Sequence, residues 1–278
     1  MPNPRAILAK YRIRPLKRLG QSFLADPNII RKIIEISDIR PDETLVEIGA
    51  GLGVMTALMA GRAEKVIALE IDGALIAVLR EELKQQDNVE ILHADALKFD
   101  FRLRGGAAIK VIGNIPYSIS SQILFRLLEA RDRISSMVLM FQREVAERLV
   151  AAPGTKAYGI LSVLVGVYTE AAIAFHVSPR CFYPRPNVES AVVRMDIRKK
   201  PLVDVRDDAC LLAVVRSAFS KRRKTLLNNL KASPRIGLRH EAVLGVLDSL
   251  GIDPSRRAET LAPEDFARLS NAFLRQYT

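Results

Sequence analysis

The chain has 278 residues, 49% of them hydrophobic, which is enough to bury a full core and argues against an intrinsically disordered protein. No apolar stretch reaches the roughly 18 residues that a membrane-spanning helix needs. The N-terminus is basic and lacks the apolar core of a secretory signal. Two cysteines without disulfide or metal-binding spacing and three scattered histidines predict a cytoplasmic protein with no structural metal.

The positive charge is concentrated in two segments. Residues 1–25 contain six basic residues and no acid, and residues 209–240 contain eight basic residues and no acid. These fourteen charges exceed the net charge of +11, so the rest of the chain is slightly acidic. Because a solvated surface usually mixes both signs, this segregation predicts a polyanionic partner and favours nucleic acid over a basic face without a ligand.

Apolar runs alternate with amphipathic segments through most of the chain. Strands are predicted at 44–49, 65–71, 89–95, 108–113, 135–141, 173–177 and 190–197. Between them, segments such as 72–86 carry apolar residues at three- and four-residue intervals, which is typical of helices. The alternation predicts an α/β fold with a mostly parallel, doubly wound sheet.

The pattern changes after Lys199, Lys200 and Pro201, where helical periodicity continues without further strands. We therefore place a domain boundary near residue 200. The sequence predicts an α/β domain at 1–200 with a basic N-terminal arm, and a smaller all-helical domain at 201–278.

A glycine-rich loop follows the first predicted strand. It contains Gly49, Gly51 and Gly53, whose missing side chains let the backbone approach a ligand at a helix N-terminus. Glu70 ends the next strand, 17 residues after Gly53, where a carboxylate can bind both hydroxyls of a ribose. The combination predicts a nucleotide-type cofactor site rather than a packing turn.

The spacing of these glycines is G-x-G-x-G, preceded by Glu47, and differs from the dinucleotide fingerprint G-x-G-x-x-G. It resembles the loop of S-adenosylmethionine-dependent methyltransferases. Asp95, at the end of the third predicted strand, fits the position where such enzymes hold the adenine amino group; the alternative for this residue is a helix cap.

The fourth predicted strand leads into Asn114, Ile115, Pro116 and Tyr117. Methylating the exocyclic amine of a base is difficult because the nitrogen lone pair is delocalised into the ring. The side-chain carbonyl of Asn114 and a backbone carbonyl beside Pro116 can accept the two N–H hydrogens, and Tyr117 offers a face on which a base can stack. Positioning and acceptor dipoles would supply most of the catalysis, without a strong general base. The alternative is a plain strand-to-helix turn.

Over nearly its whole length the sequence resembles the ribosomal RNA adenine dimethyltransferase family, of the KsgA type. The segments that carry the resemblance include RLGQSFL (18–24), EIGAGLG (47–53), ALEID (68–72), GNIPYSIS (113–120), FYPRPNVESAVV (182–193) and AFSKRRKTLLNNL (218–230). The resemblance implies a Rossmann-like enzyme that transfers two methyl groups from S-adenosylmethionine to N6 of each of two adjacent adenosines. It places them in the 3′-terminal hairpin loop of small-subunit ribosomal RNA, late in ribosome biogenesis, and implies a monomer that uses no metal.

The resemblance also implies roles for individual residues. The methyl-donor site would be formed by the backbone at Ser22 and Leu24 together with the glycine loop, Glu70, Asp95 and Asn114. Tyr117 and Phe182 would sandwich the target adenine, although Phe182 alone would be interpreted as a core aromatic. The four consecutive charges Lys221, Arg222, Arg223 and Lys224 would meet RNA phosphates. Two departures are visible, since Ser22 stands where the family often has Asn and Ala50 where it often has Pro.

Three other functions remain open at this stage. A large-subunit methyltransferase of the macrolide-resistance type shares the core, although FYPRPNVESAVV and RRAETLAPEDFARL fit the small-subunit family better. An RNA-binding assembly or transcription factor on the same fold would not need intact cofactor and target motifs. A dehydrogenase is disfavoured by the glycine spacing.

Overall fold

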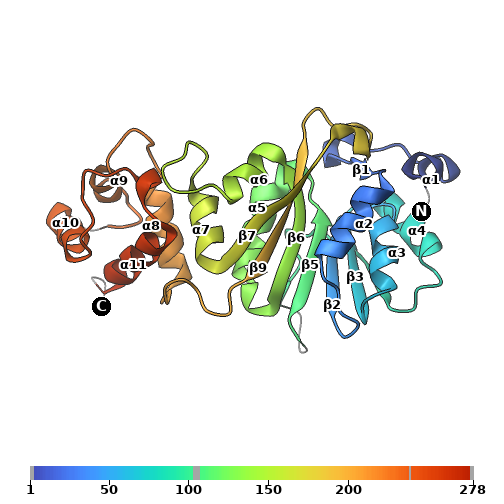
Figure 1. Cartoon of the computed structure of the whole chain (residues 1–278), viewed down its shortest axis with the longest axis horizontal. Helices are drawn as coiled ribbons and strands as arrows, with labels where there is room; N and C mark the ends of the chain where they lie inside the picture. Colours follow the sequence, from blue (N-terminus) through green and yellow to red (C-terminus); the bar gives the residue numbers. More distant parts are fainter. Residues whose placement is uncertain (1–2, 103–106, 238, 276–278) are drawn as a thin grey trace. The chain divides into compact units, whose positions relative to one another are not determined.

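The computed structural model describes residues 3–102, 107–237 and 239–275 (Figure 1). Residues 1–2 and 238 of the two basic segments, and residues 276–278 of the predicted helical domain, lie outside the described residues. The chain divides into two compact units, Met1–Ala146 with Ala172–Ile197, and Glu147–Ala171 with Arg198–Thr278. The second unit thus includes residues 147–171, which the predicted division assigned to the first domain. Whether 1–200 and 201–278 are separate domains stays a prediction.

The first unit is built around a sheet with flanking helices. Its helices are α1 (Pro4–Lys10), α2 (Pro27–Ile36), α3 (Val54–Ala60), α4 (Gly73–Glu82), α5 (Ser120–Glu129) and the start of α6 (Arg143–Leu149). Its strands are β1 (Phe23–Leu24), β2 (Thr44–Ile48), β3 (Lys65–Glu70), β4 (Val89–His93), β5 (Ile109–Asn114), β6 (Ile134–Gln142), most of β7 (Thr169–Val177), β8 (Phe182–Tyr183) and β9 (Ser190–Ile197).

The main sheet has seven strands in the order β4-β3-β2-β5-β6-β9-β7. The pairs β4–β3, β3–β2, β2–β5 and β5–β6 are parallel, and β9 runs antiparallel to β6. This confirms the predicted mostly parallel, doubly wound α/β fold. From β2 the chain proceeds to β3 on one side and later returns to β5 on the other. The carboxyl ends of β2 and β5 therefore form the switch point at which such sheets bind ligands.

The two-residue strands β1 and β8 form a separate antiparallel pair, in which Phe23 pairs with Tyr183 and Leu24 with Phe182. The sequence did not predict them, because two residues are too few to show an alternating pattern. They join the N-terminal arm to the proline-rich loop that precedes β9.

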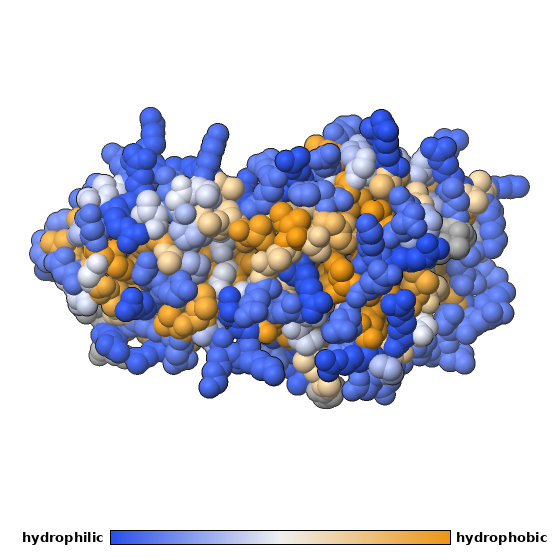
Figure 2. All heavy atoms as spheres, viewed as in Figure 1, coloured by the Kyte–Doolittle hydropathy of each residue, from blue (hydrophilic) through white to orange (hydrophobic). Residues whose placement is uncertain are grey.

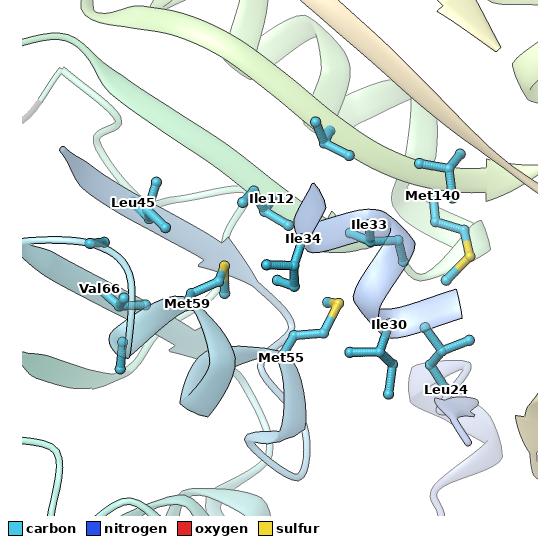
Figure 3. Packing of buried hydrophobic residues seen from close by; sticks show 14 of the residues in the cluster. Leu24, Ile30, Ile33, Ile34, Leu45, Met55, Met59, Val66, Ile112 and Met140 are labelled. Carbon is cyan, nitrogen blue, oxygen red and sulfur yellow. The ribbon is translucent and has the colours of Figure 1, made fainter. Parts of the chain in front are cut away.

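The hydrophobic core cluster that includes residues of α2, α3 and the main sheet consists mostly of aliphatic side chains and methionines. Ile33 and Ile34 of α2 and Met59 of α3 pack with Leu45 of β2 and Ile112 of β5 (Figure 3). Helix α2 begins at a proline after an Asp26 cap. It repeats isoleucine at helical spacing, so Ile33 and Ile34 lie on its buried face. Burying each such side chain contributes about 1.5–3 kcal/mol.

The second unit is helical apart from the first residues of β7. Its helices are α7 (Ile160–Tyr168), α8 (Asp208–Ala218), α9 (Leu226–Lys231), α10 (His240–Ser249) and α11 (Pro263–Leu274), with the end of α6. Aromatic rings lie at its centre, with half-buried Phe219 stacked on buried Phe266 at 5.7 Å between ring centroids. On the face shown in Figure 2, hydrophilic residues cover most of the surface and hydrophobic ones gather in smaller groups. Within the described ranges, no helix combines the length and apolarity needed to cross a bilayer.

A matched pair of substitutions tests the α2 core. Ile34 is 1% exposed and Ile71 is 48% exposed. We expect Ile34→Ala to lower the free energy of unfolding by about 2–5 kcal/mol, because it leaves a cavity. Ile71→Ala should cost less than about 1 kcal/mol, since its side chain already contacts water. Urea unfolding of the ligand-free protein measures both, and equal losses would contradict the packing described here.

Candidate active site

A pocket opens at the carboxyl ends of β2, β3 and β5. The empty space within it is about 910 Å³ when its open mouth is included. Its lining includes the arm at 19–24, the glycine loop at 49–52, Glu70 with Ile71, and the turn at 114–117. The strand order therefore brings together segments that are far apart in the sequence.

The glycine loop has backbone conformations and close contacts that a Cβ atom at these positions would disturb. Gly51 and Gly53 have φ values of +58° and +77°, in the left-handed region that favours glycine. A Cβ on Gly51 would also lie 3.2 Å from the ring of Phe23, and one on Gly53 would lie 3.0 Å from Leu79. The loop thus packs tightly beneath the arm while its backbone faces the pocket. Gly53 itself does not line the pocket.

Glu70 is almost completely buried and accepts three backbone hydrogen bonds. Oε1 accepts from the N–H groups of Ile71 and Asp72, and Oε2 accepts from the N–H of Gly51, each at 2.9 Å. Burial raises the pKa of the Glu70 carboxyl, and these hydrogen bonds oppose the rise because they favour the charged form. Oε2 has one donor and retains capacity for a hydroxyl from a ligand.

Asn114 is oriented by the arm. Its Nδ2 donates to the backbone carbonyl of Ser22 at 2.9 Å. A carbonyl cannot donate, so this contact identifies which end of the amide is nitrogen. The side-chain oxygen of Asn114 is therefore not turned toward the Ser22 carbonyl. Ile115, Pro116 and Tyr117 follow it along the pocket wall.

Glu47 is a second buried carboxyl that lines the pocket. It is 1% exposed, and its Oε2 accepts a hydrogen bond from Thr56 Oγ1 at 2.5 Å. Burial raises its pKa to about 8, the hydrogen bond from Thr56 acts in the opposite direction, and the charge of Glu70 adds to the rise. The sequence singled out Glu47 only as part of the glycine motif.

Tyr117 lines the pocket, and its hydroxyl lies 2.7 Å from Ser190 Oγ. Burial raises the pKa of this phenol, so it is neutral at physiological pH. Phe182 is only 5% exposed and belongs to the aliphatic core cluster rather than to the pocket lining. Of the two predicted stacking residues, the structure brings one to the pocket.

The donor-site prediction also named Ser22, Leu24 and Asp95, and these residues differ in whether they line the pocket. Ser22 and Leu24 line it. Asp95 follows β4 and does not line it; its Oδ1 accepts from the Leu97 N–H at 2.9 Å in a turn at 96–98, where the alternative prediction was a helix cap. Its strand neighbours β3, where Glu70 pairs with His93 and Ala94 N donates to Glu70 O at 2.9 Å, so Asp95 lies two residues after the partner of Glu70.

Sequence reasoning missed two polar residues at the pocket. Gln21 Nε2 donates to Asp72 Oδ2 at 2.7 Å, and Gln21 Oε1 accepts from the Leu16 N–H at 2.7 Å. Asp72 also caps α4 by accepting from Ala74 N at 3.0 Å. Both residues lie inside the RLGQSFL and ALEID segments, which was the one signal available. Together they fasten the arm beside Glu70.

The predicted phosphate-binding residues Lys221, Arg222, Arg223 and Lys224 are all exposed in the turn between α8 and α9. Buried Asn229 supports this turn, since its Nδ2 donates to Ala218 O at 2.6 Å and to Lys221 O at 3.0 Å. Within the described part of the chain, no acid forms an ion pair with any of the four. Nor do the described residues include a cluster of His, Cys, Asp and Glu that could hold a metal ion.

A sequence model of the family described as ribosomal RNA adenine dimethylase matches residues 14–274. The chain belongs to this family. Membership confirms the resemblance found in the sequence and identifies a methyltransferase of ribosomal RNA adenine, from a family whose methyl donor is S-adenosylmethionine. It removes the dehydrogenase alternative.

Individual relatives of the dimethylase family agree with this. A protein named ribosomal RNA small subunit methyltransferase A from Syntrophus aciditrophicus is 50% identical, covering 96% of this chain and 97% of its own. One of the same name from Pelotomaculum thermopropionicum is 48% identical, covering 97% and 95%.

Solved structures show the same fold. A dimethyladenosine transferase from Plasmodium falciparum has a TM-score of 0.82 at 27% identity, covering 92% of this chain and 98% of its own. The 23S rRNA methyltransferase ErmE has a TM-score of 0.67 at 30% identity, covering 90% and 99%.

Glu47 generates a prediction about pH. Its pKa of about 8 in the folded protein lies above the ordinary 4.5, so the folded chain holds the proton more tightly than the unfolded chain. Its contribution to stability is therefore present below pH 4.5 and is lost as pH rises through about 8. We expect Glu47→Gln, which keeps an oxygen that can accept from Thr56, to have a higher melting temperature than the unsubstituted protein at pH 9. Its melting temperature should also fall less steeply as pH rises.

The control for this experiment is Glu90→Gln, an exposed carboxyl on the same sheet that pairs with Lys65. Glu90→Gln should leave the slope of melting temperature against pH unchanged. If Glu47→Gln gives the same slope as the unsubstituted protein between pH 5 and 9, the carboxyl of Glu47 is ionised throughout and our assignment is wrong.

Proposed function

We propose that the protein dimethylates N6 of two adjacent adenosines in the 3′-terminal hairpin loop of small-subunit ribosomal RNA. The observation that carries this proposal is the orientation of Asn114 at the end of the pocket, beside Ile115, Pro116 and Tyr117. The names of relatives at 48–50% identity support the small subunit as the substrate. The protein would act as a cytoplasmic monomer, without a metal, late in assembly of the subunit.

S-adenosylmethionine fits the pocket as the methyl donor. Glu70 retains acceptor capacity on Oε2 for the ribose hydroxyls. The backbone of Gly49 and Gly51, with no Cβ in the way, would contact the amino-acid part of the donor together with the arm at Ser22 and Leu24. Asp95 would accept from the adenine amino group after release from the turn in which its Oδ1 accepts from Leu97 N.

Asn114 and the residue after it would hold the amine to be methylated. The carbonyl of Pro116 accepts from Ile119 N at 3.0 Å, so we assign the carbonyl of Ile115 as the second acceptor beside Asn114 Oδ1. Two acceptors on the two N–H groups draw N6 toward tetrahedral geometry and free its lone pair. N6 then forms a bond to the methyl carbon, the bonding pair returns to sulfur as the sulfonium becomes a thioether, and the surplus proton leaves to water.

Tyr117 would stack on the extruded adenine, since it lines the pocket beside Asn114. Phe182 would form the second face of the sandwich only after leaving the core. This step requires the proline-rich loop around β8 to move as the base enters.

The exposed cations would hold the RNA. Besides Lys221–Lys224, the arm presents Arg12, Arg14, Lys17 and Arg18, all exposed and, within the described ranges, without an ion pair. Arg18 immediately precedes the pocket-lining residues 19–24. Such cations supply affinity by neutralising phosphates and releasing counterions, and they carry no sequence information.

A large-subunit methyltransferase is the second candidate, because the 23S enzyme ErmE is 30% identical over most of the chain. One assay separates the two. Labelled S-adenosylmethionine is offered with unmethylated small and large subunits, and the label is mapped. Dimethyladenosine at an adjacent pair near the 3′ end of the small-subunit RNA is the expected result, whereas label in the large subunit supports the second candidate. Label in neither subunit, with donor bound, would support an RNA-binding factor.

Asn114→Ala tests the mechanism. Losing one preorganised acceptor should lower kcat for methyl transfer by about 10²–10³-fold, because the amide acts on charge that develops in the transition state. Asn28→Ala, an exposed asparagine on α2, is the control and should keep full activity. Single-turnover transfer to small subunits measures the effect, with melting temperature as the check on folding. Activity of Asn114→Ala within a few-fold of the unsubstituted enzyme would refute the proposed role.

Replacing Lys221, Arg222, Arg223 and Lys224 by glutamine tests the RNA contact. Each lost phosphate contact should reduce the slope of log affinity against log salt by about 0.7–0.9. The matched control replaces four exposed cations outside both basic segments, Arg31, Lys32, Arg62 and Lys98. Filter binding of small subunits at several salt concentrations measures the slopes, and an unchanged slope in the first variant would remove the assignment.

A further inference from the structure

The N-terminal arm contacts both sides of the proposed reaction. We use "arm" for residues 3–25 and "target loop" for residues 178–189, which contain Phe182. The arm lines the donor pocket at 19–24 and pairs with the target loop through β1 and β8. Leu24 both lines the pocket and pairs with Phe182, so the arm connects the two directly.

On the donor side the arm is fixed at three points. Asn114 Nδ2 donates to Ser22 O, Gln21 donates to Asp72, and the Phe23 ring packs against the backbone of the glycine loop at Gly51. All three partners belong to segments that line or border the pocket. A ligand there contacts the arm directly, because residues 19–24 form part of the wall.

On the target side the arm holds the loop by backbone and side chain. Ala25 N donates to Cys181 O at 2.7 Å, and Ser22 Oγ donates to Pro184 O at 2.8 Å. The guanidinium of Arg5 lies 4.6 Å from the centre of the Tyr183 ring. Phe182 lies between these contacts and pairs with Leu24.

Ser22 is where the two sides meet. Its carbonyl accepts from Asn114 and its hydroxyl donates to Pro184, so one residue contacts both the amide of the methyl-transfer site and the loop that carries Phe182. We propose that Ser22 is a positioning residue that transmits occupancy of the donor pocket to the target loop. Donor binding orders the arm, and the Ser22 hydroxyl passes that order to the loop before the base enters.

This inference rests on the proposed function only in the identity of the donor-site ligand. Hydrogen exchange of the full chain, followed by mass spectrometry, tests it without RNA. The probe is S-adenosylhomocysteine, at concentrations that saturate each variant. Peptides covering the glycine loop report the pocket, and peptides covering 178–189 report the target loop. The measured quantity is the ratio of exchange rates without and with the probe.

In the unsubstituted protein the probe should slow exchange in both regions. Ser22→Ala keeps the backbone carbonyl and removes only the hydroxyl. The ratio of exchange rates for the target loop should therefore fall by about two- to tenfold, which corresponds to the loss of one hydrogen bond. Ser22→Thr, which keeps a hydroxyl, should restore it. Arg5→Ala removes a second side-chain contact with the loop, the one over the Tyr183 ring, and should weaken the transmission as well. Ser178→Ala is the control, because its hydroxyl accepts from Arg180 N within the loop and, among the described residues, has no hydrogen bond to the arm.

Each other outcome is decisive. If the probe slows the glycine loop but not the target loop in the unsubstituted protein, the coupling is absent and the proposed function still stands. If Ser22→Ala accelerates the target loop equally with and without the probe, the hydroxyl is merely structural and our inference is wrong. If the probe slows neither region, the donor site itself is misassigned, and both proposals fall.

Discussion

The hydrogen bond from Asn114 Nδ2 to Ser22 O determines which end of an amide is available at the end of β5. An amide has a donor end and an acceptor end of similar shape, and only the acceptor end can draw on the N–H groups of an amine. The arm resolves this ambiguity from 92 positions away. The proposed chemistry depends on it, because a reversed amide would repel the amine that the enzyme must hold.

Two buried carboxyls next to this amide are treated differently by their surroundings. Glu70 receives three backbone N–H groups, which offset part of the cost of burying its charge. Glu47 receives one hydroxyl, and burial raises its pKa to about 8. The site therefore combines one carboxyl held ready for hydroxyl donors with one that binds a proton at neutral pH. Such contrasts in neighbouring acids are common at functional sites and come at the expense of stability.

The second unit carries a concentrated group of positive charges at Lys221–Lys224. Its four consecutive cations lie exposed on a turn whose backbone is tied to buried Asn229, so they are fixed in place although their side chains reach into solvent. Mutual repulsion among them would be relieved by the phosphates of the proposed RNA substrate. The same reasoning applies to the arm, whose cations lie beside the pocket in the first unit. This accounts for the segregated charge that the sequence displays.

Sequence patterns alone were enough to predict the strands of the main sheet, the glycine loop with Glu70, and the Asn114–Tyr117 turn. Each of these features shows as a periodicity or a short motif among neighbouring residues. Such patterns could not determine what depends on distant partners. The β1–β8 pair and the Gln21–Asp72 bond leave no periodic signal. Ser22 and Pro184 are separated by 162 positions, and only the tertiary structure brings them within hydrogen-bonding distance. The physical reason is that local patterns reflect contacts within a few residues, whereas the strand order and the path of the arm decide which loops meet at the site.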